Sequence, residues 1–86
     1  MDLNEKFEDA QKRVKTLSKT PTPDVLLKLY GLYKQGAVGD VDGKRPGMLD
    51  IKGRAKYDAW AGRKGMSRDT AKEEYVKYVD ELLKRQ

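Results

Sequence analysis

Apolar residues recur along most of the chain at the spacing typical of an α-helix. The first segment is expected to be helical from Leu3 to Leu17. Its apolar positions step by four, three, four and three residues, which places them on one helical face. These positions are Leu3, Phe7, Ala10, Val14 and Leu17.

Two prolines within three residues end this pattern and predict that a second helix begins at Pro23, with Thr22 as its N-cap. The second helix is expected to extend to Val38, and Gly36 and Gly39 weaken its end. Its apolar arc is wider than one packing seam needs, because two stripes lie side by side. One stripe is Leu26, Leu29, Tyr30, Tyr33 and Ala37, and the other is Leu27, Gly31 and Lys34.

Residues 39–50 form a long loop with three glycines and one proline. A loop of this length inside a compact domain is more often functional than not. Its single apolar pair, Met48 and Leu49, is expected to pack back onto the core.

Two further helices follow the loop. Asp50 is expected to cap a helix from Ile51 to Gly62, and Ser67 to cap a last helix that continues almost to the C-terminus. Four helices without a strand signal predict an all-α, four-helix bundle that forms a single domain over residues 1–86. The long loop argues against simple up-down-up-down order, since it could leave two helices parallel. The inward positions of these helices are Ile51, Ala55, Ala59, Trp60, Ala71, Tyr75, Tyr78, Val79, Leu82 and Leu83.

Composition argues against catalysis. The chain of 86 residues has no cysteine and no histidine, so it lacks thiolate ligands, a cysteine nucleophile and the commonest general base. Its N-terminus is acidic and lacks an apolar stretch, and no run of about 18 apolar residues occurs. We therefore expect no enzyme activity, no metal or cofactor, and a cytoplasmic location.

The formal charge of +5 indicates an anionic partner, or simply a soluble surface rich in lysine. The basic residues are spread over all four expected helices among 14 acidic ones, which argues against tracking a nucleic-acid backbone. A binder of nucleic acid or anionic membranes, with strongly salt-dependent affinity, remains one alternative. A module that recognises a partner helix or peptide is the other.

The segment that begins at Asp40, DVDG, resembles the start of a calcium-binding loop. The full pattern also requires an acid or amide at its fifth position and a glutamate at its twelfth. Lys44 and Ile51 occupy those positions, so the segment is interpreted as a structural turn.

Tyr30, Tyr33 and Lys34 lie on neighbouring parts of one helical face. A tyrosine ring can stack on a base, and a lysine suits phosphate, so the three could hold a nucleotide. Alternatively, both tyrosines are half-buried core residues and Lys34 is solvated. A further group, Lys52, Arg54 and Lys56, puts three positive charges near the positive end of the third helix, where an acidic ligand would relieve them.

Three segments together carry a resemblance to the acyl-CoA-binding protein family: YGLYKQ from Tyr30, RPGMLD from Arg45, and KGRAK from Lys52. The likeness covers nearly the whole chain. It implies a four-helix bundle in up-down-down-up order, with the long loop between helices 2 and 3. It also implies a carrier and buffer that binds long-chain fatty acyl-CoA esters non-covalently and without catalysis or a cofactor.

The resemblance assigns the nucleotide end of the ligand to five residues. Tyr30, Lys34 and Lys56 would bind the 3′-phosphate. Tyr33 would stack on the adenine. Tyr75, on the last helix, would close the site from the far side.

The resemblance also extends the site toward the acyl chain. Lys15 would approach the CoA head group or the acyl region, and Leu26 and Leu27 would line the acyl groove. Gly31 and Leu32 lie within the matching segment and are included in the expected ligand-binding set.

Two departures from the family pattern bear on the acyl chain length that the protein prefers. Tyr57 replaces a usual tryptophan, and Lys28 stands where an apolar residue is common. The implied partners are long-chain acyl-CoA and, transiently, acyl-CoA-using enzymes and membranes. Nucleic acid is not among them, and a monomer is expected.

Overall fold

The computed structural model describes residues 1–86 and contains four α-helices and no strand. The prediction of an all-α fold with four helices is confirmed. The expected first helix is divided in two, because a short 3₁₀ helix follows its α-helical part. The elements are α1 (Leu3–Arg13), η1 (Val14–Thr16), α2 (Pro23–Ala37), α3 (Ile51–Ala61) and α4 (Arg68–Arg85).

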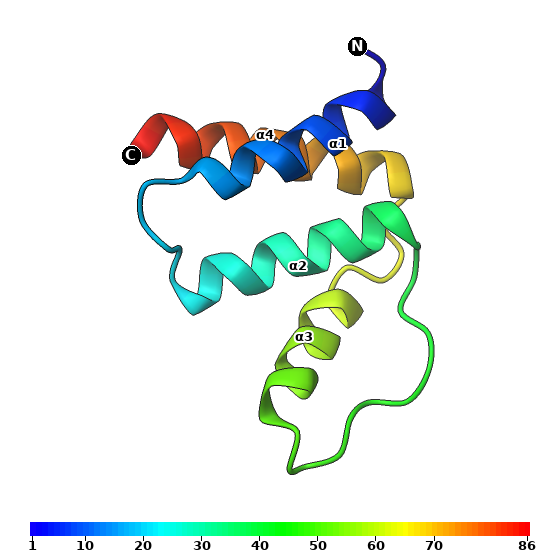
Figure 1. The fold of residues 1–86 in the computed structure, drawn as a ribbon. Helices are drawn as coiled ribbons and strands as arrows, with labels where there is room; N and C mark the ends of the chain where they lie inside the picture. Colours follow the sequence, from blue (N-terminus) through cyan, green and yellow to red (C-terminus); the bar gives the residue numbers. More distant parts are fainter.

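The helices pack in an order that differs from their order in the chain. Helix α4 lies between α1 and α2, whereas α3 packs only against α2. Figure 1 shows α1 and α4 running in the same direction and α2 running opposite to both. Helix α3 follows the long loop and leans away from the other three. This is the up-down-down-up arrangement that the resemblance implied.

Local sequence signals explain where the helices begin. Asp50 accepts a hydrogen bond from the Gly53 amide, and Ser67 accepts one from the Thr70 amide, so both predicted caps are confirmed. Pro23 occupies the first turn of α2 as expected, but the Thr22 side chain makes no capping hydrogen bond. Thr22 thus occupies the N-cap position as predicted, but without a side-chain cap, and the fixed φ of the proline that follows favours this helix start.

The core is small and is formed by α1, α2 and α4. Six residues make one buried cluster. Five of them lie on the apolar stripes predicted for these helices, whereas Leu32 belongs to neither stripe predicted for the second helix. Helix α3 has no fully buried residue, so it is attached to the bundle rather than built into its centre. The clustered residues are Phe7, Ala10, Leu29, Leu32, Tyr75 and Val79.

Helices α2 and α3 meet at Gly31. A Cβ atom on Gly31 would lie 2.5 Å from the carbonyl oxygen of Ala59. That separation is too short for any side chain. The backbones of α2 and α3 can approach this closely because residue 31 is a glycine.

The long loop is held to α3 by hydrogen bonds, whereas its apolar pair is exposed to solvent. The Trp60 indole donates to the Gly39 carbonyl at 2.7 Å, and Arg45 forms hydrogen bonds of 2.9 and 2.7 Å to the two oxygens of Asp58. The expected packing of Met48 and Leu49 onto the core is wrong: their side chains are 81% and 101% exposed. The loop is held by its polar anchors, and its apolar pair lies beyond them.

The inward orientation expected for α3 is correct only in part. Trp60 is half-buried, as are Ala55 and Ala59, whereas Ile51 is 77% exposed. The reason is that α3 contacts α2 through its C-terminal half, so its first turn has no partner.

Asp40 is a structural hydrogen-bond acceptor. Its Oδ1 accepts from the Gln35 amide side chain and from the Gly65 backbone amide, both at 2.9 Å, and so joins the end of α2 to the segment before α4. The hydrogen bond from Gly65, followed by the one from Gln35, lowers the pKa of Asp40 below its usual value. No group of three or more acidic side chains is placed to hold a metal ion. None of the four helices combines the length and the hydrophobicity that a membrane span requires.

Candidate functional site

An open groove of about 330 Å³ lies where α2 faces η1 and the middle of α4. This volume is at the small end of the ~300–1,000 Å³ range of ligand pockets. The groove brings together five of the residues predicted for the site, which are Lys15, Leu26, Tyr30, Tyr33 and Tyr75. The fold creates this site, because the residues that line it come from distant parts of the chain, between Val14 and Tyr75.

Two of the groove tyrosines, Tyr33 and Tyr75, form a continuous cluster of three aromatic rings with Phe7. The Phe7 ring stacks on Tyr33 with centroids 6.0 Å apart and meets Tyr75 edge-on at 5.2 Å. Tyr75 is only 4% exposed, whereas Tyr33 is 37% exposed and offers part of its ring to solvent. A planar ligand group could therefore stack on Tyr33 without unfolding the core.

Burial widens the pH range over which the Tyr75 phenol stays neutral. Desolvation, and secondarily the neighbouring Tyr33, raise the pKa of Tyr75 above its usual value of about 10. The hydroxyl is thus a hydrogen-bond donor throughout the physiological pH range.

Three lysines at or near this groove have no acidic partner. The Lys56 ammonium lies 5.6 Å from the centre of the Tyr30 ring, and the Lys34 ammonium lies 4.7 Å from that of Trp60. Lys15 lines the groove itself. The three ion pairs of the molecule involve only Arg13 and Arg45, so none of these lysines has a carboxylate within 4.0 Å. Their charge is available to an anion.

Five residues of the expected set do not line the groove: the two lysines described above, Lys34 and Lys56, and three residues of α2, Leu27, Gly31 and Leu32. Leu32 is 1% exposed and belongs to the core cluster, and Gly31 is buried against α3. Leu27 is half-buried and does not border the groove, unlike Leu26, which is 46% exposed. Gly31 and Leu32 therefore support the site through packing, and Leu26 is the exposed leucine at the groove.

Three apolar residues that were not predicted for the site also line the groove: Val14, Pro21 and Leu29. Val14 and Leu29 were expected to be core residues, and Pro21 a helix breaker. The signal that could have found Val14 is its position next to Lys15 in the last turn of the first helical segment. Nothing in the local sequence marks Pro21, because it reaches the groove only through the path of the α1–α2 loop.

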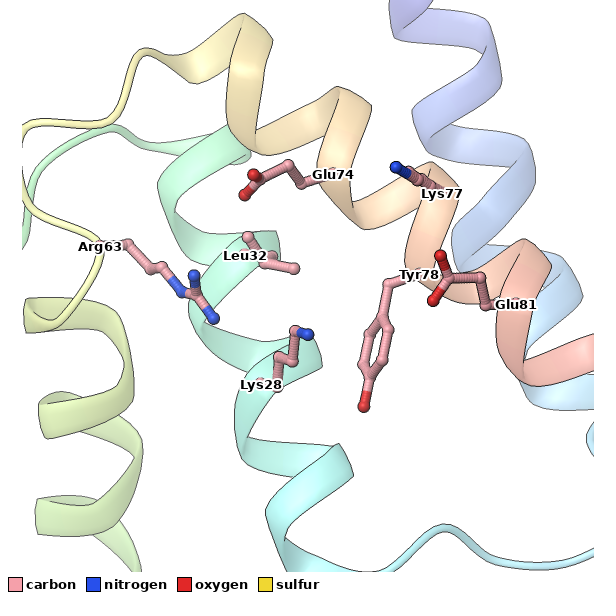
Figure 2. Close-up of a pocket in the computed structure, with 7 residues that line it drawn as sticks. All are labelled: Lys28, Leu32, Arg63, Glu74, Lys77, Tyr78 and Glu81. Atoms are coloured by element: carbon pink, nitrogen blue, oxygen red, sulfur yellow. The ribbon is translucent and has the colours of Figure 1, made fainter.

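A second cleft, of about 290 Å³, lies between α2 and α4 beside the segment that follows α3. Figure 2 shows its lining residues, in which three cations alternate with two carboxylates. Its apolar contribution comes from Leu32 and Tyr78, and the Lys28 ammonium lies 4.2 Å from the centre of the Tyr78 ring. Lys28 therefore lines this cleft and does not line the apolar groove. The mixed charges make the second cleft unsuited to an acyl chain.

The chain matches a family model described as acyl CoA binding protein over residues 4–79. It is 52% identical to acyl-CoA-binding protein homolog 1 of Caenorhabditis elegans, with 90% of each chain covered. It is 46% identical to the acyl-CoA-binding protein homolog of Drosophila melanogaster, with 94% of each covered. Among solved structures it is similar to Oryza sativa acyl-CoA-binding protein 2, with a TM-score of 0.92 and 42% identity over 96% of this chain and 90% of that one.

Proposed function

Because this chain belongs to the acyl-CoA-binding protein family, whose members bind their ligand without transforming it, we propose that the groove described above holds long-chain acyl-CoA for carriage and buffering. One observation carries this assignment of the site. The apolar groove is lined by Lys15 and by Tyr30, whose ring lies 5.6 Å from the Lys56 ammonium, and neither lysine has an acidic partner. The same groove presents the partly exposed ring of Tyr33, which Lys34 follows in the chain. A ligand with a hydrocarbon chain at one end and phosphates and a base at the other matches that pattern.

The acyl chain is assigned to the apolar side of the groove. Val14, Pro21, Leu26 and Leu29 provide its hydrocarbon surface. Each methylene that leaves water contributes ~0.8 kcal/mol, so a long chain contributes ~10 kcal/mol before the costs of ordering. Leu27 is left out of this lining because it does not border the groove.

The phosphate end is assigned to Tyr30, Lys34 and Lys56. Each lysine now rests near an aromatic ring, and a phosphate would replace a cation–π contact of ~0.5–1 kcal/mol with charged hydrogen bonds of ~1.5–3 kcal/mol. The exchange favours the bound state. Lys15, in η1, adds a further positive charge at the groove.

The base is assigned to the exposed face of Tyr33. Its other face is occupied by Phe7, which fixes the ring in place. Tyr75 lies 6.5 Å away, centroid to centroid, and its neutral hydroxyl can donate to the ligand from the far side of the site. Because the Tyr33 ring is already held in place, little conformational entropy is lost when a base stacks on it.

The proposal extends to the cellular setting. The carrier acts as a monomer in the cytoplasm and exchanges its ligand during transient contacts with membranes and with enzymes that use acyl-CoA. Nucleic acid is not a partner, because the exposed cations do not form a continuous stripe along one helix.

Native mass spectrometry of the protein purified from expressing cells tests the ligand assignment. The expected result is a series of complexes whose added masses match acyl-CoA esters. Bound oligonucleotide, or a protein that never retains acyl-CoA even after addition of palmitoyl-CoA, would overturn the proposal.

A further inference from the structure

Three large apolar side chains lie together in water at one corner of the molecule. Met48, Leu49 and Ile51 are 81%, 101% and 77% exposed. Figure 1 shows this segment, the end of the long loop and the first turn of α3, projecting from the bundle on the side away from α1 and α4. Single exposed apolar residues are ordinary on protein surfaces, but a group of neighbours indicates an interaction site.

The corner is an ordered projection. The Asp50 amide donates to the Gly47 carbonyl at 3.0 Å, which closes a turn around Met48 and Leu49. The Asp50 side chain accepts from the Gly53 amide at 2.9 Å and so fixes the start of α3. Tyr57 donates to the Gly43 carbonyl at 3.1 Å on the other side of the turn. The three apolar side chains are therefore presented outward by polar contacts at the base of the turn.

Positive charge surrounds the corner. Between Lys44 and Lys56 the sequence has five cations and a single carboxylate, Asp50, which is engaged as the helix cap. Arg45 is neutralised by Asp58, but Lys44 and Lys52 have no carboxylate within 4.0 Å. The N-terminal end of α3 adds positive dipole character in the same place. Apolar side chains with free cations beside them match the headgroup region of an anionic bilayer, where phosphates lie above hydrocarbon.

We propose that Met48, Leu49 and Ile51, with Lys44 and Lys52, form the surface by which this protein docks on membranes that contain anionic phospholipid. The inference rests on the proposed function in one respect: it names the surface for the transient membrane contact of the carrier. Three side chains on a convex corner cover far less than the ~800 Å² that a stable protein partner needs, which favours a lipid surface. Docking is weak and reversible, since each cation contributes about fivefold and the apolar insertion is shallow.

The absence of cysteine allows a site-specific probe. Leu49→Cys labelled with the fluorophore NBD reports on the corner. Val38→Cys with the same label is the matched control, because Val38 is also exposed, at 54%, and lies outside the corner at the end of α2. The vesicles contain phosphatidylcholine and phosphatidylserine at a ratio of about three to one. NBD emission should shift to the blue and brighten at position 49, and it should stay unchanged at position 38. Equal responses at both positions, or none at position 49, would overturn the proposal.

Unlabelled variants separate the two components of binding. In vesicle flotation, Leu49→Ser should lower the bound fraction by about tenfold at limiting lipid, whereas Val38→Ser should not. Lys52→Gln should lower it by about fivefold, whereas Lys12→Gln, on the exposed side of α1, should have no such effect. Vesicles of phosphatidylcholine alone should bind little wild-type protein. Wild-type protein that fails to float with anionic vesicles contradicts the docking surface.

Failure of this inference is distinguishable from failure of the proposed function. Leu49→Ser should retain the circular dichroism spectrum and the palmitoyl-CoA affinity of the wild type, since Leu49 contacts neither the core nor the groove. Loss of vesicle binding with intact palmitoyl-CoA binding supports the docking surface. Loss of both in this variant would show that the corner belongs to the ligand site, and would overturn its assignment as a separate surface.

Discussion

The ammonium of Lys56 on α3 lies 5.6 Å from the centre of the Tyr30 ring on α2. This contact joins a cation from the outlying helix to a groove residue from the central one, although the two are far apart in the sequence. It depends on the close approach of α2 and α3 at Gly31, where the Ala59 carbonyl would lie 2.5 Å from an added Cβ. The phosphate end of the proposed site is thus built on the junction between two helices.

Replacement of Lys34 by alanine is predicted to weaken palmitoyl-CoA binding by about ten- to a hundredfold, because one or two charged hydrogen bonds to phosphate are lost. Isothermal titration calorimetry measures the change, and thermal unfolding checks that the fold is intact. Lys12→Ala, on the exposed side of α1, is the matched control and should bind like the wild type. Unchanged affinity in a folded Lys34→Ala protein would remove Lys34 from the site.

Replacement of Tyr30 by phenylalanine tests one hydroxyl while it keeps the ring beside Lys56. Affinity for palmitoyl-CoA should fall by about 0.5–1.5 kcal/mol, the value of a single neutral hydrogen bond, which is a smaller loss than in Lys34→Ala. Tyr57→Phe is the control, because the Tyr57 hydroxyl bonds the Gly43 carbonyl and not the groove. If both variants lose the same affinity, the effect comes from loop order and not from contact with the ligand.

Replacement of Gly31 by alanine should push α2 and α3 apart. We expect it to destabilise the protein by about 1–3 kcal/mol, more than the gain in helix propensity of ~1 kcal/mol. Gly47→Ala is the control, since nothing lies within 4 Å of a Cβ there. Chemical denaturation compares the two. Equal stability of both variants would show that the helices separate at no cost.

The ion pair between Arg45 and Asp58 should make the stability of the folded protein depend on pH in the acidic range. The hydrogen bond from Arg45 lowers the pKa of Asp58 in the folded protein. The pair therefore contributes stability above the usual aspartate pKa of about 3.9, and this contribution is lost as the pH falls through the lowered pKa.

Melting temperatures measured from pH 7 down to about pH 2 should show Asp58→Asn below the wild type at neutral pH, with the difference disappearing in acid. Glu73→Gln, at an exposed position of α4 without an ion pair, is the control. A difference between wild type and Asp58→Asn that persists at the lowest pH would contradict the role of the charged pair.

Helix positions could be predicted from the sequence because apolar periodicity and capping residues are local. The path of the long loop could not. Its direction depends on the positive φ of Gly39, 102°, and on anchors such as the bond from Trp60 to the Gly39 carbonyl, which join residues about twenty positions apart. Met48, Leu49 and Ile51 were therefore placed inward because they are apolar, whereas the anchors turn them outward.

The types of residue in the proposed site could be predicted from the sequence better than the list of residues that line the groove. The matching segment runs continuously from Tyr30 to Lys34, but a helix rotates about 100° per residue, so neighbours point in different directions. Tyr30 and Tyr33 face the groove, whereas Gly31 and Leu32 face α3 and the core. Pro21 could be found only once the fold placed the α1–α2 loop against α2.

Calorimetry of the wild-type protein with three ligands is the most direct test of a groove that is apolar at one end and cationic at the other. Palmitoyl-CoA should bind far more tightly than either free CoA or palmitate, and each two-carbon lengthening of the acyl chain should strengthen binding by up to ~1.6 kcal/mol until the groove is filled. Equal affinity for CoA and palmitoyl-CoA would contradict an acyl groove at Leu26. Equal affinity for palmitate and palmitoyl-CoA would contradict a phosphate site at Lys34 and Lys56.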